Sequence, residues 1–319
     1  MKSFVIFLIL AVCAPAALRF EGSLDAMGTT FSVVAYGKDR FKMQAAVELA
    51  FDEVRRLDQL LSNYRPESEW SGVNRQAAER PSKVSVELFD LLAACLRYSG
   101  ASEGAFDITV GPLMKVWGFY KGSGRLPHRA EIKGALARVG YRNIELDERN
   151  RTVRFRKPGV EIDPGGIGKG YAVDQMVKIL KDNHIQSALM TAGSSSIYAI
   201  GVPETDARGW RIEIRHPKDA NKTVAEVYLK DESMSTSGNY EKFFRVRNTM
   251  YSHIMDPRTG YPAQRMLSVS VIAPRTLDSE AWTKPYYVNG RAWAATHRIK
   301  SSRVFLCEDG SDVACAWLQ

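Results

Sequence analysis

Hydrophobic residues recur every three to four positions in several parts of the chain, which is the spacing of one face of an α-helix. The clearest case is residues 43–61, and the same spacing predicts helices over residues 86–99, 129–139 and 171–183. Within residues 43–61 the apolar positions are Val47, Ala50, Phe51, Val54, Leu57 and Leu61. Each of these helices should bury its apolar face against the rest of the protein.

Shorter apolar or alternating runs between the helices predict β-strands. These runs cover residues 31–36, 153–155, 160–162, 187–190, 197–200, 210–215, 223–229, 267–273 and 303–307. Several neighbouring runs are joined by short turns and should pair as hairpins. Helices interleaved with hairpins predict an α+β fold with mainly antiparallel sheets and packed helices. Because no long linker divides the chain, we expect residues 17–319 to form one large domain of two intimately joined lobes.

The N-terminal segment has the order of a secretory signal. A positively charged start (MKS) precedes the apolar run FVIFLILAV and the small residues Ala14-Pro15-Ala16. This order predicts a signal peptide over residues 1–16, because the apolar run is too short to span a bilayer. The segment LAVC also resembles part of a lipobox, so a membrane tether through a lipidated Cys13 is an alternative. In both cases we expect an extracytoplasmic (periplasmic) protein.

Composition and charge narrow the class of ligand. The chain has 319 residues, of which 45% are hydrophobic and 25% charged, as in ordinary globular proteins. Its formal net charge of +8 fits an anionic ligand but is too mild to indicate a nucleic-acid partner. Cys307 and Cys315 flank the turn residues Glu308-Asp309-Gly310, so a hairpin could bring them together. An oxidising compartment would permit a disulfide bond between them.

The most informative segment is DPGGIGKGY, residues 163–171, which lies between a predicted strand and a predicted helix. Its glycines allow a ligand to approach the backbone closely, and the N-terminus of the following helix favours an anion such as phosphate. Lys169 adds a full positive charge. The segment is not a Walker A loop, because Asp163 stands where that loop needs glycine and Gly170 where it needs Ser or Thr.

Further motifs follow one another in a fixed order along the chain. They are AMGTT (residues 26–30), LSNYRPESE (61–69), GAFDITVGPL (104–113) followed by WGF (117–119), TSGNY (236–240) and SHIMDPRTG (252–260). Together with residues 163–171, these motifs resemble the FAD:protein FMN transferase family, also called the ApbE flavin transferases. The resemblance extends from Met27 to about Gly290, and it implies an ApbE-like, T-fold-like architecture.

The resemblance also implies an activity, the transfer of FMN from FAD to a Thr hydroxyl of a partner redox protein with release of AMP. His253 is similar in position to the family's proposed catalytic base, and an imidazole is suited to accept a hydroxyl proton near neutral pH. The FAD-contacting positions would be Met27, Tyr64, Ala105, Phe106, Asp107, Asp163, Lys169 and Ile254. The alternatives are an FAD pyrophosphatase that yields FMN and AMP, and an FAD-binding protein without catalysis.

The chain departs from the family at the expected Mg²⁺ site. The resemblance implies a backbone oxygen matching Gly166, and an Asp and a Thr at the positions that Glu280 and Lys284 occupy here. A protonated lysine cannot ligate a metal. In one interpretation Mg²⁺ still binds through Gly166, Glu280 or Asp278 and waters. In the other, the Lys284 ammonium replaces the metal, pairs with Glu280 and holds the diphosphate. Pro285 should also disfavour an uninterrupted helix here.

Overall fold

The computed structural model describes residues 17–310 and 313–319. The expected signal peptide over residues 1–16, with Cys13, lies outside these described residues. Within the described part of the chain, no helix has the length and apolar character needed to cross a membrane.

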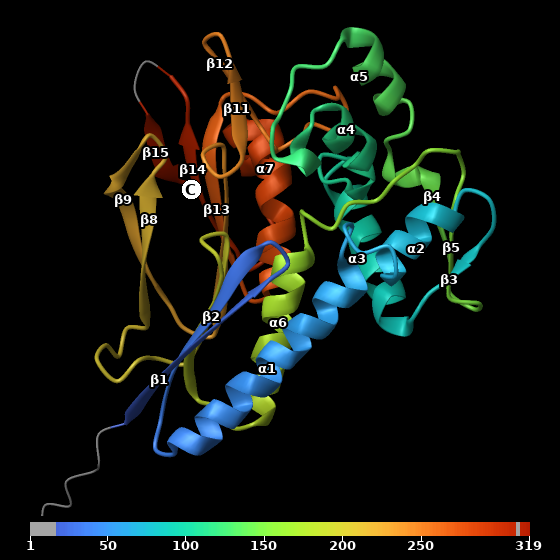
Figure 1. The fold of residues 1–319 in the computed structure, drawn as a ribbon. Helices are drawn as coiled ribbons and strands as arrows, with labels where there is room; N and C mark the ends of the chain where they lie inside the picture. Colours follow the sequence, from blue (N-terminus) through green and yellow to red (C-terminus); the bar gives the residue numbers. More distant parts are fainter. Residues whose placement is uncertain (1–16, 311–312) are drawn as a thin grey trace, which may run out of the picture.

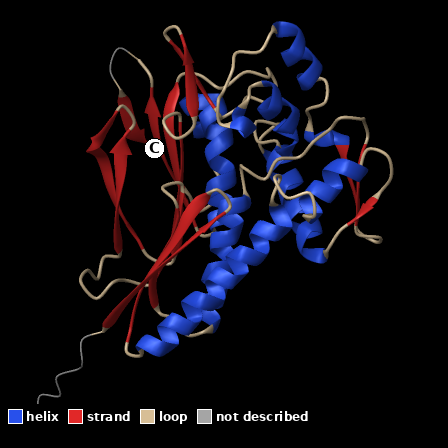
Figure 2. Ribbon diagram, viewed as in Figure 1, coloured by secondary structure: helices blue, strands red, loops and turns tan. Residues whose placement is uncertain are grey.

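An eight-stranded sheet forms one layer of the molecule (Figure 1; strands are red in Figure 2). Its strand order is β1-β2-β6-β7-β10-β13-β14-β15. The strands are β1 (Leu18–Ala26), β2 (Thr29–Gly37), β6 (Ser187–Ala192), β7 (Ser196–Ile200), β10 (Glu232–Gly238), β13 (Met266–Ala273), β14 (Arg303–Glu308) and β15 (Ala314–Trp317). Each neighbouring pair is antiparallel, which confirms the predicted sheet type.

Long helices cover one face of this sheet (Figure 1). They are α1 (Arg40–Leu61), α6 (Gly168–Asp182) and α7 (Thr276–Thr296). At the start of α1, the Asp39 side chain accepts the N–H of Lys42 and caps the helix. The apolar face predicted for this helix, including Val47 and Val54, is fully buried and packs in one core with Phe31 of β2.

The opposite face of the sheet is covered by the hairpin of β8 (Trp210–His216) and β9 (Asp219–Leu229). Trp210 and Ile212 of this hairpin belong to the same apolar core as Leu267 and Phe305 of the sheet. Strand β13 lies between this hairpin and the helices, and all of its residues are buried. The sheet is therefore an inner layer at this strand, covered on both faces.

A second, mainly helical lobe lies beside the long helices, on the side away from the sheet (Figure 1). Its elements are α2 (Glu69–Gln76), α3 (Val86–Ala101), α4 (Gly111–Val116), α5 (Arg129–Leu136), the small sheet of β3 (Ser82–Lys83), β5 (Thr152–Phe155) and β4 (Ile144–Asp147), and the 3-10 helices η1 (Ile108–Val110), η2 (Phe119–Lys121) and η3 (Tyr141–Asn143). Its core includes Leu61 of α1, Ile167 before α6, and Leu277 of α7. Because the long helices contribute to both cores, the two lobes are intimately joined.

The strand predicted over residues 160–162 is wrong. The N–H of Ile162 donates to Asn74 Oδ1, and its carbonyl accepts from Trp70 Nε1 and Asn74 Nδ2. Side chains of the second lobe therefore occupy the backbone groups that a strand would use for pairing, and the segment is extended without belonging to a sheet.

The expected break at Pro285 is also wrong. Helix α7 continues through Pro285, and the range Thr276–Thr296 consists of two helical pieces joined at a kink at Gly290, where φ is 79°. A proline inside a helix removes one hydrogen bond. Here the helix is held by tertiary packing, since Tyr286 and Tyr287 are almost completely buried.

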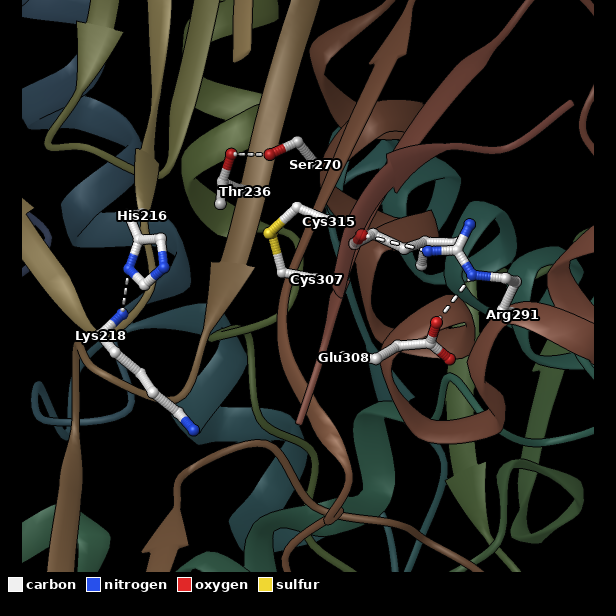
Figure 3. Close-up of a disulfide and its surroundings, with 9 residues drawn as sticks. His216, Lys218, Thr236, Ser270, Arg291, Cys307, Glu308 and Cys315 are labelled. Carbon is white, nitrogen blue, oxygen red and sulfur yellow. Dashed lines mark hydrogen bonds and ion pairs between the residues drawn. A yellow bond between two sulfur atoms is a disulfide. The ribbon is translucent and has the colours of Figure 1, made fainter. Parts of the chain in front are cut away.

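Cys307 and Cys315 form a disulfide bond between the neighbouring strands β14 and β15 (Figure 3). They are directly opposite in the strand register, with their Cα atoms 4.1 Å apart. The pairing that the turn sequence allowed is thus present. Next to it, Glu308 accepts a hydrogen bond from Arg291 Nε at 2.7 Å, which ties β14 to the C-terminal part of α7 (Figure 3).

Candidate functional site

A cavity of about 670 Å³, here called the large chamber, lies beside the glycine turn at residues 163–168. A recess of about 90 Å³, the small chamber, adjoins it. The two chambers share the lining residues Met114, Asp163, Gly165 and His253, so they form one site. Their combined size is in the range typical of small-molecule sites.

A hairpin of β11 (Phe243–Val246) and β12 (Thr249–Ser252) brings two lining residues to the site. Lys242 precedes this hairpin and His253 follows it, and both line the large chamber. The hairpin is held against the second lobe by aromatic contacts of Phe244 and Tyr251 with the buried Trp117. This packing fixes where His253 enters the cavity.

Most of the residues predicted from the sequence gather around these chambers. The large chamber is lined by Met27, Tyr64, Asp163, Lys169 and His253. The small chamber is lined by Ala105, Phe106, Asp107, Asp163, Gly166, His253, Ile254 and Lys284. Glu280 is the exception, because it lines neither chamber.

Asp163 connects the glycine turn to the second lobe. Its Oδ1 accepts the N–H of Gly165 at 2.8 Å, and its Oδ2 accepts from Asn63 Nδ2 at 2.8 Å and from the Tyr120 hydroxyl at 2.6 Å. Burial raises the pKa of Asp163, and these hydrogen bonds offset part of that change. A Cβ on Gly165 would lie 2.7 Å from Asp163 Oδ1, so this turn requires glycine.

His253 lies at the junction of the chambers in a defined orientation. Its backbone N–H donates to the Lys242 carbonyl at 3.0 Å, and its Nδ1 is 3.1 Å from the same oxygen. A carbonyl only accepts, so Nδ1 carries the proton and Nε2 is the basic nitrogen. The pKa of His253 is lowered to about 4, mainly by burial and to a smaller extent by the positive charges of Lys169 and Lys242, whereas the hydrogen bond to the Lys242 carbonyl and the Glu241 charge oppose this change. The ring is therefore neutral at physiological pH.

Asp107 faces the small chamber but is held mainly by its own lobe. Its carboxylate accepts hydrogen bonds from the N–H and the hydroxyl of Thr109 and from the N–H of Tyr141. Burial raises the pKa of Asp107 to about 6, against the effect of these hydrogen bonds. Asp107 therefore shapes the wall of the small chamber by fixing the backbone on both sides of it.

Lys169 and Lys284 bring positive charge to opposite parts of the site. Lys169 is in the first turn of α6 and lines the large chamber, whereas Lys284 extends from α7 into the small chamber. Lys284 Nζ donates to the Glu280 carbonyl at 2.9 Å and lies 4.0 Å from Glu280 Oε1. Burial lowers the pKa of Lys284 to about 8, and the Glu280 carboxylate opposes this change. The ammonium form predominates at neutral pH.

Comparison with known proteins adds to this geometry. The model of the ApbE family matches residues 27–303. The chain belongs to the ApbE family. A curated relative from Klebsiella pneumoniae (strain 342), named FAD:protein FMN transferase, is 32% identical over 261 residues, covering 81% of this chain and 78% of the relative. A relative of the same name from Treponema pallidum (strain Nichols) is 32% identical over 279 residues, covering 83% and 77%.

A solved structure agrees with the fold of this ApbE-family chain. The ApbE protein of Thermotoga maritima has a TM-score of 0.85 and 29% sequence identity, covering 93% of this chain and 96% of that one. The family and the α+β architecture expected from the sequence are both confirmed.

The residues of this ApbE-family chain do not fit the Mg²⁺ ion that the resemblance implies. Glu280 is 2% exposed and its carboxylate accepts the N–H of Gly170, so it is turned away from the chamber beside Gly166. Lys284 places an ammonium there instead. Mg²⁺ needs several oxygen ligands in near-octahedral geometry. Among residues 17–310 and 313–319, no group of three or more His, Cys, Asp or Glu is arranged to hold a metal. The metal site expected at Gly166 and Glu280 stays a prediction.

Several lining residues were given no role from the sequence, and two of them, Asn63 and Tyr120, bind Asp163. Asn63 is inside the motif at residues 61–69 but was given no role, and Tyr120 lies outside the motifs. Tyr120 reaches Asp163 because η2 is flanked by Gly118 and Gly122, both with positive φ (74° and 70°). No spacing in the sequence indicates that this turn approaches the glycine turn, so Tyr120 could not have been found without the fold.

Proposed function

We propose that the chain is an FAD:protein FMN transferase, which moves FMN from FAD to a Thr side chain of a partner redox protein and releases AMP. The observation that supports this best is the position of His253, whose basic Nε2 belongs to a residue lining both chambers. The curated relatives described above carry the name of this activity.

In the proposed reaction, the Thr oxygen attacks the phosphorus atom of the FMN half of FAD. A new P–O bond forms as the bond to the AMP phosphate breaks, and AMP leaves with the electron pair of that bond. His253 Nε2 accepts the proton of the Thr hydroxyl. Because burial lowers the pKa of His253 to about 4, the neutral base is available throughout the physiological range.

The remaining residues would hold FAD. Lys169 and the N-terminal end of α6, where Ile167 provides no side-chain cap, would attract the phosphates. Met27, Tyr64 and Phe106 would offer apolar and aromatic surfaces to the flat rings. Tyr64 is 72% exposed, so it is free to close onto a ligand in the large chamber.

Two alternatives use the same cavity. With water in place of the Thr hydroxyl, the reaction becomes FAD hydrolysis to FMN and AMP. Without effective charge stabilisation of the phosphates, the protein would bind FAD and not turn it over. The observation that favours this second alternative is Lys284, which occupies the place expected for the metal.

For location, we propose an extracytoplasmic protein whose acceptor is exposed on the same side of the membrane. The Cys307–Cys315 disulfide bond supports an oxidising compartment. A signal peptide over residues 1–16 and a tether through Cys13 stay predictions, which mass spectrometry of the protein isolated from membranes would test.

The experiment that tests the activity incubates the purified protein with FAD and an acceptor redox protein, and measures AMP by chromatography. The same acceptor with its Thr changed to Val is the control. AMP formed only with the Thr acceptor, together with covalent flavin fluorescence on that acceptor, is the expected result. AMP formed without acceptor would replace the proposal with a pyrophosphatase. Bound FAD without any AMP would replace it with a binding protein.

A further inference from the structure

The small chamber is lined by a lysine, Lys284, that is placed to contact an anion. Its side chain is 21% exposed, and its Nζ donates to the Glu280 carbonyl at 2.9 Å. An ammonium group has three N–H donors, so donors remain for a ligand in the chamber. The Lys284 Cε lies 3.6 Å from the position that a Cβ would take on Gly166. The ammonium therefore lies directly beside the glycine turn.

Glu280 does not neutralise this ammonium by a close ion pair. Its Oε1 is 4.0 Å from Lys284 Nζ, beyond hydrogen-bond distance. Its other oxygen accepts the N–H of Gly170, and a Cβ on Gly170 would lie 2.7 Å from that oxygen. The Glu280 side chain is 3% exposed. One carboxylate oxygen thus binds the first turn of α6, and Glu280 lines neither chamber.

We propose that Lys284 is the resident cation of the small chamber and binds the diphosphate of FAD in place of a divalent metal ion. The identity of the ligand rests on the proposed function. An ammonium makes short, charge-assisted hydrogen bonds to phosphate oxygens and is a common point-charge partner of phosphate. The ammonium would repel a divalent cation in the same chamber. The carboxylates that line the chamber, Asp107 and Asp163, already accept hydrogen bonds from Thr109 and Tyr141 and from Gly165, Asn63 and Tyr120.

Lys284 supplies one positive charge where Mg²⁺ would supply two, so the leaving AMP phosphate receives less stabilisation. FAD should therefore bind without metal, and transfer should be slow and insensitive to a chelator.

The test measures FAD affinity by calorimetry in a buffer with EDTA and in a buffer with MgCl₂. It compares the wild type with K284M, which keeps a long unbranched side chain but removes the charge. K133M is the matched control, because Lys133 is exposed on α5 and lines neither chamber. The wild type and K133M should bind FAD equally well in both buffers. K284M should bind FAD about 10- to 100-fold more weakly in both buffers, because it loses a charge-assisted hydrogen bond. Riboflavin, which has no phosphate, should bind K284M and the wild type alike.

Wild-type binding that requires MgCl₂ would overturn the inference, and so would K284M with unchanged FAD affinity. Metal-dependent binding with intact transfer would overturn this inference alone, whereas metal-independent binding without transfer would overturn only the proposed activity. Absence of FAD binding in both buffers would overturn both. A thermal melt reports whether K284M is folded. If K284M is unfolded, the comparison of wild-type FAD affinity in EDTA and in MgCl₂ still tests the inference. K284R, which keeps the positive charge, should bind FAD without metal.

A second test asks whether a metal site can be restored. K284T alone should stay insensitive to Mg²⁺, because Glu280 still faces the N–H of Gly170. The double variant E280D/K284T shortens the carboxylate and removes the ammonium, and it should gain Mg²⁺-dependent FAD binding. No gain in the double variant, in a protein that still folds and binds FAD, would count against the assignment of Lys284 to the metal's place.

Discussion

Changing Gly170 to Ala should destabilise the protein, because α6 and α7 meet at this residue without space for a side chain. The new Cβ would lie 2.6 Å from the Thr276 carbonyl oxygen and 2.7 Å from Glu280 Oε2. The first contact is with backbone, so the helices must move apart. Overpacking of this kind costs about 1–3 kcal/mol, and weakening the Gly170 hydrogen bond to a buried carboxylate adds about 1.5–3 kcal/mol. The higher helix propensity of Ala returns about 1 kcal/mol.

The net loss is then about 3 kcal/mol, which corresponds to a decrease in Tm of roughly 5 °C for a chain of this size. The measurement is thermal unfolding followed by circular dichroism. G134A is the matched control: Gly134 is within α5, and an added Cβ there would meet no atom within 4 Å. G134A should be unchanged or more stable by about 0.5–1 kcal/mol. If G170A melted with or above G134A, the close approach of the two helices at this residue would be refuted.

Three further predictions follow from the site and the fold. H253A should lower the rate of transfer about 100-fold or more with little change in FAD affinity. In the wild type, kcat/KM plotted against pH should fall on the acid side near the lowered pKa of His253, about 4. A fall near pH 6.5 would contradict the lowered pKa. Burial raises the pKa of Asp107 to about 6, so the folded chain binds this proton more tightly than the unfolded chain. Its contribution to stability is present at low pH and is lost as pH rises through 6. In urea unfolding at pH 5 and pH 7.5, the free energy of unfolding of the wild type relative to that of D107N should therefore be higher at pH 5. An equal difference at both pH values would argue against the raised pKa of Asp107. Replacing Cys307 and Cys315 by Ala should lower the free energy of unfolding by about 2–3 kcal/mol, because the disulfide closes only a short loop. A wild-type Tm that does not change when reductant is added would contradict this stabilisation.

The sequence predicts best those elements that have one buried face. Helix α1 is an example, because Val47 and Val54 recur on one stripe and the opposite side is exposed. Helix α7 has no such stripe: its residues are buried on several sides, since the sheet and α6 both pack against it, and Pro285 further obscured it. Strand β1 was not predicted because it is an edge strand in which polar residues alternate with partly buried ones.

The candidate site shows the same division between local and tertiary information. The order of the motifs predicted that Asp163, Lys169 and His253 line one cavity. This works because each motif is a short piece of backbone that takes the same place in the shared fold. Spacing also placed Glu280 beside Lys284, but it could not tell which N–H group the carboxylate would meet. That depends on how close α7 comes to Gly170, which is decided by packing and not by either helix alone.

The glycine turn is held by buried carboxylates that come from different parts of the fold. Asp163 fixes its first part through Gly165 and through Asn63 and Tyr120 of the second lobe. Glu280 of α7 holds the first turn of α6, which directly follows the glycine turn, through the N–H of Gly170. A buried carboxylate is tolerated only when hydrogen bonds replace its lost hydration, so these contacts are required by the fold as much as by the site. Glu280 lines neither chamber, so under the proposed function we expect the positive charge beside the phosphates to come from another residue. We therefore expect the two residues of α7 to have separate roles, in which Glu280 holds the first turn of α6 and Lys284 faces the ligand in the small chamber.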